Sequence, residues 1–577
     1  MGQYWKYIKA HIIPFIFGPI LMLTEVAGEI VLPTIMASMI DDGIMNNNIP
    51  YVISRMAIMF GCICVMIIGG LGGHYLSVKA SVSFSADIRK DLFKKVQSFS
   101  FKNIDTFSTG SLVTRLTNDI TQIQNITRMF LIMAMRSPGM LIGGIIMALK
   151  LNASLATILI VVIPLLGASI GALMYTAYPR FGRVQQKLDS LNSGIQENIT
   201  NVRVIKSFVR EKFEIDKFRT ANEDLKDTML RAMKIVICTM PVMTLAMNIT
   251  MLVTVWRGGH LVVGGGMKVG DLTAFTTYIV QILMSLMMVS MLFLQSARAA
   301  ASSRRIKEVL NTVVDLTDDV SKQKEKKVER GEVEFKNVCF KYYESRKDNI
   351  LNHINFKINP GETIGIIGAT GSGKTSLVQL IPRLYDVTEG EVLVDGVNVK
   401  DYGIHNLRDG VGMVLQKNVL FSGTIEDNLK WGDENAVHEE IEEAADSAQA
   451  DSFIKSFTDG YNTELGQGGV NVSGGQKQRL CIARALLKKP KILILDDSTS
   501  AVDTATEAKI RHAFRTTLKD TTKIIIAQRI SSIVDADKIL VLSEGNVTGF
   551  GTHDELIKTN DEYRDIYRSQ VDEEVTA

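Results

Sequence analysis

Six stretches before residue 300 are each long and apolar enough to cross a lipid bilayer. A helix that spans the hydrocarbon core needs roughly 20 residues, and every stretch reaches that length. They lie at 13–39, 52–77, 129–149, 153–174, 235–257 and 271–297. The chain is therefore predicted to begin with an α-helical membrane domain of six spans.

The loops between these stretches differ in positive charge. Residues 79–128 and 178–234 are long and rich in Lys and Arg, whereas 41–50 carries neither. Because positively charged loops stay in the cytoplasm, both long loops and both termini are predicted there. The long loops keep helical periodicity, so the membrane helices are expected to extend well into the cytoplasm. The amphipathic residues 4–9 are expected to lie at the membrane interface, and no cleavable signal is indicated.

The rest of the chain reads as a soluble domain. Its 577 residues are too many for one core. The predicted division is a membrane domain over 1–310, a charged linker over 311–330 and a soluble domain over 331–577. The net charge of +2 implies no general attraction to nucleic acid. The five cysteines form no CxxC motif and no disulfide framework, which favours a reducing compartment.

A phosphate-binding loop is present in the soluble domain. Residues 368–375 read Gly-Ala-Thr-Gly-Ser-Gly-Lys-Thr and fit the pattern G-x-x-x-x-G-K-[ST]. An apolar strand precedes the loop and a helix follows it, as the motif requires. Glycines let backbone N–H groups converge on phosphates, and the helix N-terminus adds its dipole. Lys374 is predicted to reach the β- and γ-phosphates, and the Thr375 hydroxyl to hold Mg²⁺.

Two later segments belong to the same kind of site. An apolar strand ends in Asp496, a carboxylate suited to the Mg²⁺ ion. Before it, the run Ser-Gly-Gly-Gln at 473–476 opens a predicted helix, and such a helix start is an anion site. If this helix lies across the domain from the phosphate-binding loop, it cannot reach that loop's phosphates. It is therefore predicted to serve a second chain.

Together these motifs resemble the ATP-binding cassette (ABC) exporters, and the likeness covers essentially the whole chain. It implies a helical membrane domain of six spans with an α/β P-loop nucleotide-binding domain, arranged as a half-transporter. By motif match, Tyr342 resembles the aromatic residue that stacks on adenine, and Gln416 the glutamine that contacts Mg²⁺ and relays toward the membrane domain. Residues 500–503 resemble the D-loop. Residues 107–119 and 201–208 resemble the two intracellular loops whose short helices press on the nucleotide domains.

The resemblance thus implies a set of residues that bind ATP and its metal ion. Those expected at the nucleotide are Tyr342, Gly368, Thr370, Gly371, Ser372, Gly373, Lys374, Thr375, Ser376, Gln416, Ser473, Gly474, Gly475, Gln476 and Asp503. Those expected at Mg²⁺ are Thr375, Gln416 and Asp496.

The sequence departs from the family at two positions expected to act in hydrolysis. Asp497 stands where these ATPases have a Glu that orients the attacking water, and Gln528 where they have the switch His. An Asp withdraws the carboxylate by about one bond, ~1.5 Å, and a misplacement of about 1 Å can cost on the order of 100-fold in rate. Gln cannot titrate or carry charge. The chain is therefore expected to be an ABC-type ATPase that binds ATP well but hydrolyses it weakly at its own site.

The two departures predict an asymmetric heterodimer. The expected partner is a second ABC half-transporter with an intact catalytic Glu and switch His, whose site this chain's 473–476 would complete. The alternative is neutral drift in a homodimer that still turns over slowly.

The predicted function is ATP-driven export of small amphiphilic molecules, drugs or lipids. The alternative is a regulatory or channel-type ABC protein in which ATP binding gates a pore or a partner. The compact length, without a long regulatory insertion, favours the exporter. A bacterial inner membrane is the expected location, with the nucleotide domain in the cytoplasm.

Charged residues within the spans point to a substrate cavity. Glu25 and Glu29 are four residues apart and so share a helical face. Ionisable groups in a span usually face a cavity or a partner, and Arg136 is a conceivable partner. The pair is predicted either to attract cationic substrates or to form a structural salt bridge. Methionines recur at helical spacing in the last two spans, which suits a promiscuous apolar surface or ordinary packing.

Overall fold

The computed structural model describes residues 2–342, 348–498 and 502–576, with some further side chains left out. The chain divides into two compact units. The first holds Met1–Gln97 and Gly110–Asn311, and the second holds Ser98–Thr109 and Thr312–Ala577. The predicted division placed residues 98–109 within the membrane domain. Their contacts place them in the second unit, which we call the cassette.

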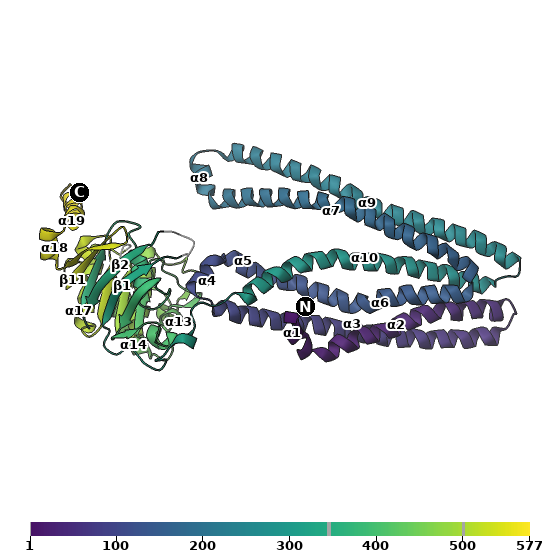
Figure 1. The fold of residues 1–577 in the computed structure, drawn as a ribbon, viewed down its shortest axis with the longest axis horizontal. Helices are drawn as coiled ribbons and strands as arrows, with labels where there is room; N and C mark the ends of the chain where they lie inside the picture. The colour runs from purple at the N-terminus through teal and green to yellow at the C-terminus, as the bar shows by residue number, and fades with distance from the viewer. Residues whose placement is uncertain (1, 343–347, 499–501, 577) are drawn as a thin grey trace. The chain divides into compact units, whose positions relative to one another are not determined.

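The first unit is a bundle of long helices (Figure 1). Its shorter pieces are α1 (Trp5–Ala10), α5 (Thr109–Thr114), α8 (Val202–Ser207) and π-helical turns at Met39–Ile44 and Arg115–Asp119. The long helices are α2 (Ile12–Ser38), α3 (Ile49–Gln97), α6 (Ile120–Leu151), α7 (Ala153–Thr200), α9 (Glu211–Val263) and α10 (Val269–Asn311).

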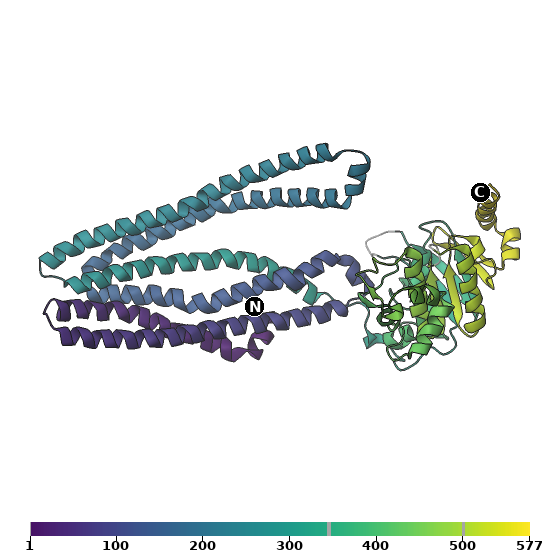
Figure 2. The same cartoon turned by 180° about the vertical axis from the view of Figure 1, so that it is seen from behind.

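The long helices pack in pairs, α2 with α3, α6 with α10 and α7 with α9. In Figure 1 and Figure 2 the α7–α9 pair diverges from the other four long helices, and the separation is greatest at the end where α8 joins α7 to α9. Among the described residues, five helical segments are long and apolar enough to cross a membrane: Ile12–Ile44, Ile49–Gln97, Thr109–Leu151, Ala153–Thr200 and Val269–Val289. The predicted span 235–257 lies within α9, which is not one of these five.

Small residues let α2 and α3 approach closely. A Cβ on Gly69 would stand 1.9 Å from Oγ1 of Thr24, and a Cβ on Gly73 would stand 3.0 Å from the carbonyl oxygen of Gly18. Glycine at these positions therefore allows backbone contact, a common basis of helix association in membranes.

The second unit is built on two sheets. The antiparallel sheet has the order β2-β1-β4-β5, and the larger sheet has the order β12-β11-β3-β10-β9-β6 with parallel pairing except at the β12 edge. The strands of the first are β1 (Val333–Phe340), β2 (Leu351–Ile358), β4 (Glu389–Val394) and β5 (Val397–Asn398). Those of the second are β3 (Thr363–Ile367), β6 (Val411–Val414), β9 (Ile492–Asp496), β10 (Thr522–Ile526), β11 (Lys538–Ser543) and β12 (Asn546–Gly551). A further short pair is β7 (Gly423–Thr424) with β8 (Glu464–Leu465).

Helices cover the sheets and carry the predicted motifs. They are α4 (Phe101–Thr106), α11 (Lys374–Gln379), α12 (Ile404–Asp409), α13 (Ile425–Leu429), α14 (His438–Ser447), α15 (Asp451–Ser456), α16 (Gly474–Leu487), α17 (Thr504–Thr517), α18 (His553–Thr559) and α19 (Asp561–Thr576). This alternation of central parallel strands and helices is the α/β architecture expected from the motifs.

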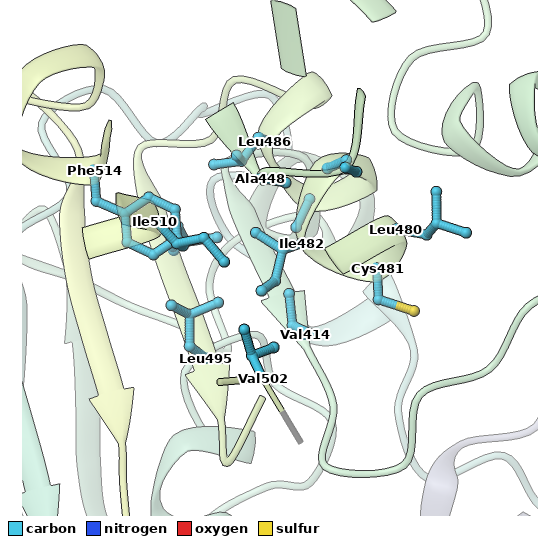
Figure 3. Close-up of a cluster of buried hydrophobic side chains, with 14 of the residues drawn as sticks. Val414, Ala448, Leu480, Cys481, Ile482, Leu486, Leu495, Val502, Ile510 and Phe514 are labelled. Carbon is cyan, nitrogen blue, oxygen red and sulfur yellow. The ribbon is translucent and has the colours of Figure 1, made fainter. Parts of the chain in front are cut away.

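The core of this unit lies on both faces of the larger sheet. Side chains alternate along a strand, so Ile492 and Ile494 of β9 join the cluster beneath the antiparallel sheet. Leu493 and Leu495 join the cluster beneath the helices. Figure 3 shows Leu495 together with side chains from α16 and α17. Every residue of β9 is buried, so the strand holds its final carboxylate on a rigid base.

Two segments outside the cassette's predicted limits are packed onto it. In the predicted linker, the Ser321 hydroxyl donates to the carbonyl oxygen of Tyr402 at 2.7 Å, and Val328 is buried. In the segment 98–109, the Asn103 amide donates to the carbonyl oxygen of Val313 at 3.1 Å. Residues 312–330 therefore belong to the cassette unit, whereas Asn311 ends α10 in the first unit.

Candidate functional site

The phosphate-binding loop joins β3 to α11 in a conformation that requires glycine. Gly368 has φ 155° and Gly373, the residue before α11, has φ 101°. A Cβ on Gly368 would stand 2.0 Å from the carbonyl oxygen of Leu542, so a side chain there is excluded. Gly371 also has a positive φ, 87°. These angles turn successive backbone N–H groups toward one point, the geometry that holds phosphate.

Lys374 lies over its own loop. Its Nζ donates to the carbonyl oxygens of Gly368 at 2.8 Å and of Ala369 at 2.9 Å. Burial lowers the pKa of Lys374, while Asp496 and Asp497 act in the opposite direction. The ammonium group is therefore held near two carboxylates by a buried stem. It could move from the loop carbonyls to a bound phosphate without leaving the site.

Thr375 and Asp496 form the pair predicted for the metal. The Thr375 hydroxyl donates to Oδ1 of Asp496 at 3.0 Å. Among the described residues, Oδ2 of Asp496 is buried without a hydrogen-bond partner. Burial raises the pKa of this carboxyl, and the Thr375 hydrogen bond and the Lys374 charge offset part of that rise.

An orphaned carboxylate oxygen beside a hydroxyl is the donor set that Mg²⁺ uses with phosphates. In the described part of the chain, no group of three or more His, Cys, Asp or Glu residues could hold a metal ion alone. The residues therefore fit an ion that takes its other ligands from phosphate oxygens and water.

Asp497 is bonded by a side-chain amide. Gln528 Nε2 donates to Oδ2 of Asp497 at 2.6 Å. Burial raises the pKa of Asp497, and the side-chain amides of Gln528 and Gln416 partly offset that rise. Asp497 has φ 49°, and its N–H donates to the carbonyl oxygen of Ile526 at 3.1 Å. Gln416, predicted at Mg²⁺, thus lies near the carboxylate beside the metal pair.

The predicted anion site at 473–476 is a capped helix start. The Ser473 hydroxyl accepts from the Gln476 N–H at 3.3 Å, and Ser473 N–H donates to Oε1 of Gln476 at 2.9 Å. Both side chains are therefore used in a capping box, and the next N–H groups, of Gly474 and Gly475, have no intrahelical acceptor. Helix α16 packs against α13 and α14, whereas α11 packs against β9 and β10.

The D-loop residues are only partly described. Ser500 and Ala501 lie outside the described residues. Oδ1 of Asp503 accepts from the Thr506 N–H at 2.9 Å and caps the start of α17. Within this chain, Asp503 therefore has a structural contact rather than one to the phosphate-binding loop.

Tyr342 is tied to the phosphate-binding helix. Its hydroxyl lies 2.8 Å from the Ser376 hydroxyl, and its ring packs edge-on against Phe340 and Tyr385. The Tyr385 hydroxyl in turn donates to Oδ2 of Asp105, in the short helix α4, at 2.7 Å. Sequence reasoning named Tyr342 but missed Tyr385 and Asp105, because no motif pairs residues so distant in the chain.

The two remaining predicted nucleotide contacts lie at the same loop. Thr370 is exposed, while Ser372 is buried and, in the described residues, its hydroxyl has no partner.

The second intracellular loop forms α8, followed by the exposed apolar residues Phe208 and Val209.

In the membrane unit, Arg136 bridges the two predicted glutamates. Its Nη1 lies 3.0 Å from Oε1 of Glu25, and its Nη2 lies 2.6 Å from Oε1 of Glu29. In the described residues, Oε2 of each glutamate is buried without a partner. Gln281 donates to the carbonyl oxygen of Glu29 at 3.0 Å. Two carboxylates and one guanidinium leave this triad, when fully ionised, with a net charge of −1.

Methionines from the last two predicted spans line a small cavity. It has a volume of about 80 Å³, and its lining includes Met243, Met247, Met284 and Met287 together with Leu166 and Leu283. The thioethers thus gather on one apolar surface between α7, α9 and α10. The side chains of Met240 and Met291 lie outside the described residues.

Comparison with known proteins gives two family matches. The family described as "ABC transporter transmembrane region" matches residues 15–286, and the family described as "ABC transporter" matches residues 351–500. Together they cover most of the membrane unit and most of the nucleotide motifs.

Relatives match over nearly the full length. The ABC transporter ATP-binding protein YfiB of Bacillus subtilis is 42% identical over 557 residues, covering 96% of this chain and 95% of YfiB. The putative multidrug export ATP-binding/permease protein YgaD of the same organism is 34% identical, covering 99% of each chain. A solved structure of a bacterial Atm1-family ABC exporter with ATP bound has a TM-score of 0.79 at 24% identity, covering 98% of each chain. The last match shows a shared fold.

Proposed function

Because the chain belongs to the ABC exporter family, a multi-pass membrane protein with an ATP-binding cassette, we propose that it is one half of a heterodimeric ATP-driven exporter. Its substrates are small amphiphilic molecules, drugs or lipids. The partner is a second ABC half-transporter that carries the catalytic Glu and the switch His absent here. The name of the relative YgaD, a putative multidrug export protein, agrees with this substrate class.

One observation carries the proposed asymmetry. The Thr375–Asp496 pair keeps the arrangement needed to hold a nucleotide–metal complex, with a 3.0 Å hydrogen bond. Beside it, Asp497 accepts a 2.6 Å hydrogen bond from Gln528. A carboxylate that is held by this amide and is one bond shorter than Glu is poorly placed to orient water. We therefore propose a site that binds ATP and hydrolyses it slowly.

Each residue of the binding half has a defined task. The N–H groups at Gly371–Gly373 and the ammonium of Lys374 neutralise phosphate charge. Thr375 and Asp496 would hold Mg²⁺, which would offset the negative charge of the phosphates. Tyr342 offers a ring for stacking on adenine. Neither Gln528 nor Gln416 can accept a proton at neutral pH, so only Asp497 could act as a base.

The chain's second contribution is made to the partner's site. The start of α16, with the N–H groups of Gly474 and Gly475, would lie against the partner's bound γ-phosphate and stabilise its developing charge. Closure of two cassettes around two nucleotides then biases the membrane helices toward the outward-open state. This is alternating access driven by differential binding to two conformations.

The substrate pathway is proposed to include the Glu25–Arg136–Glu29 triad. A net charge of −1 in a span favours a cationic group nearby, and the methionine cavity between α7, α9 and α10 offers a deformable apolar wall. The competing role is purely structural, with Arg136 joining two helices. The two carboxylate oxygens of the triad that have no partner among the described residues favour the cavity role.

Vesicle transport separates the exporter from the channel-type alternative. Inside-out vesicles carrying the chain and its partner are given ATP, and dye uptake and ionic current are both recorded. We expect ATP-dependent dye uptake without current. Current without uptake would favour a gated pore.

Nucleotide trapping tests the asymmetry. A photoreactive ATP is bound during turnover, and the two chains are separated before the trapped nucleotide is identified. This chain should hold mainly ATP through many turnovers of the partner's site. Recovery of ADP from both chains at equal rates would overturn the heterodimer proposal.

A further inference from the structure

The C-terminal helix α19 is bonded to the segment that carries Gln528. Gln570 Nε2 donates to the carbonyl oxygen of Gln528 at 2.8 Å. The N–H of Ile530 donates to Oε1 of Gln570 at 2.8 Å. The Gln570 amide thus donates to the backbone on one side of Arg529 and accepts from the backbone on the other side.

Helix α19 provides a firm base for this clamp. Tyr563 in its first turns is fully buried, and its hydroxyl lies 2.7 Å from Nδ1 of His553. Its N–H donates to Oδ1 of Asn560 at 2.7 Å, and Asn560 donates to the carbonyl oxygen of Thr548 in β12 at 2.9 Å. The start of α19 is therefore fixed to the cassette by contacts that do not involve Gln570.

The clamped segment needs such support. Gln528 and Arg529 are exposed, so little side-chain packing holds them. Ahead of them, the Ala527 N–H donates to the carbonyl oxygen of Ile366 at 3.2 Å, which fixes the end of β10. The Gln570 amide supplies the corresponding restraint on the other side. Between these two restraints, the Gln528 side chain reaches Asp497 at 2.6 Å.

We propose that Gln570 is a positioning residue that holds Gln528 against Asp497 and thereby slows the release and turnover of nucleotide at this chain's own site. This inference rests on the proposed function in one respect, that Asp497 and Gln528 face the γ-phosphate. Gln570 touches neither nucleotide nor metal in this scheme and acts only through the backbone of the switch segment, residues 528–530. The C-terminal helix then sets the behaviour of a site assembled from residues far away in the chain.

Three substitutions separate this role from a general effect on folding. Gln570→Leu keeps a similar volume and removes both hydrogen bonds. Gln570→Glu keeps the side-chain length and the acceptor for Ile530 N–H but loses the donor to Gln528. Ser569→Ala is the matched control, because Ser569 is exposed and its hydroxyl donates to the carbonyl oxygen of Ile566 in the same helix.

The experiment uses the full chain with its partner in detergent or nanodiscs. ATP labelled in the adenine ring is bound, free ATP is diluted, and the label remaining on this chain is followed by crosslinking and chain separation. Gln570→Leu should speed loss of label by about 3- to 10-fold, the scale expected for losing such hydrogen bonds. Gln570→Glu should give a smaller increase, and Ser569→Ala none, with thermal midpoints alike in all three.

A double substitution tests whether Gln570 acts through Gln528. In the background of Gln528→Ala, which removes the positioned side chain, Gln570→Leu should have little additional effect. Equal label loss for Gln570→Leu and Ser569→Ala would overturn the inference, as would additive effects of Gln570→Leu and Gln528→Ala. A fall in thermal midpoint for Gln570→Leu without any response of Gln570→Glu would also overturn it.

The outcome differs from a failure of the proposed function. If the wild-type site hydrolyses ATP as fast as the partner's, the asymmetric exporter is wrong. The role of Gln570 is then still tested by comparing the rate of nucleotide loss at this site between Gln570→Leu and Ser569→Ala.

Discussion

Gln528 donates a 2.6 Å hydrogen bond from Nε2 to Oδ2 of Asp497. The two residues predicted to replace the catalytic Glu and the switch His are therefore in direct contact. A neutral amide stabilises the ionised carboxylate but cannot take up or release a proton. Because the Asp497 carboxylate already accepts a hydrogen bond from Gln528, orienting an attacking water would require that bond to break or shift.

Restoring both family residues should raise hydrolysis at this site. In the double variant Asp497→Glu with Gln528→His, the carboxylate gains about one bond of reach, ~1.5 Å, and the imidazole can carry charge. We expect ADP formation on this chain to rise on the order of 10- to 100-fold. The measurement is the ADP fraction trapped on this chain during turnover. The control is Gln528→His alone, which leaves the short carboxylate in place and should give a much smaller gain. An unchanged ADP fraction in the double variant would mean that another feature limits this site.

The start of α16 should matter more to turnover than Asp497. Gly475→Glu places a side chain and a negative charge where the partner's γ-phosphate is expected, and should lower steady-state ATPase of the heterodimer by about 100-fold or more. Asp497→Asn should lower it by only about 2-fold, because the carboxylate it removes is already poorly placed. An acidic residue at a helix N-terminus stabilises the helix, so loss of folding is not expected for Gly475→Glu. Gly475→Ala is the uncharged control. Equal damage from Asp497→Asn and Gly475→Glu would show that Asp497 is a working catalytic residue.

Neutralising one glutamate of the membrane triad should change substrate preference. In Glu25→Gln, Arg136 keeps its 2.6 Å contact with Glu29, and the net charge of the triad rises from −1 to zero. Export of a cationic dye should therefore fall by roughly 3- to 10-fold more than export of a neutral dye of similar size. Both dyes are measured in the same vesicles, and basal ATPase is recorded alongside.

The double variant Glu25→Gln with Glu29→Gln is the informative comparison. It leaves Arg136 without either carboxylate in the span, and a charge stranded in this way is strongly destabilising. Membrane levels of the double variant should drop, while those of Glu25→Gln should not. Equal losses of both dyes in Glu25→Gln, together with low membrane levels, would assign the triad a structural role.

The contact between Tyr385 and Asp105 should couple the nucleotide site to helix α4, which directly precedes the first predicted intracellular loop at 107–119. Tyr385→Phe keeps the ring against Tyr342 and removes only the 2.7 Å hydrogen bond to Asp105. We expect drug-stimulated ATPase and dye export to fall by about 2- to 10-fold, the range for one hydrogen bond. Basal ATPase should stay within about 2-fold, because Tyr385 holds no phosphate.

Asp105→Asn serves as the conservative control for this contact. It keeps an oxygen that can accept from Tyr385 and should retain most of the coupling, whereas Asp105→Ala should behave like Tyr385→Phe. If Tyr385→Phe and Asp105→Ala add fully when combined, the two residues act separately.

The sequence predicted the elements whose chemistry depends on local pattern. The membrane stretches, the glycines of the phosphate-binding loop and the helix start at Ser473 follow from hydropathy, backbone freedom and capping, all of which are local. From the sequence, Glu25 and Glu29 were predicted to share a helical face, with Arg136 as a partner. The geometry of the triad could not be predicted. That depends on how α2 and α6 pack.

The contacts that sequence reasoning missed join distant segments. Gln570 meets Gln528 across 42 residues, and Tyr385 meets Asp105 across 280. No periodicity or motif encodes such pairs, because tertiary packing alone brings them together. The same holds for residues 311–330, whose charge resembles a linker although Val328 is buried in the cassette core.

The placement of residues 98–109 in the cassette unit has a consequence for biosynthesis. Asp105 leaves the ribosome 280 residues before its partner Tyr385, while the membrane helices that flank it are still being inserted. The cassette therefore completes its surface with a piece that was made first and is anchored at both ends in the bilayer. A cassette expressed alone from residue 312 lacks that piece and leaves the Tyr385 hydroxyl without Asp105. A cut at residue 312 therefore separates the cassette unit from residues 98–109, which belong to it by their contacts.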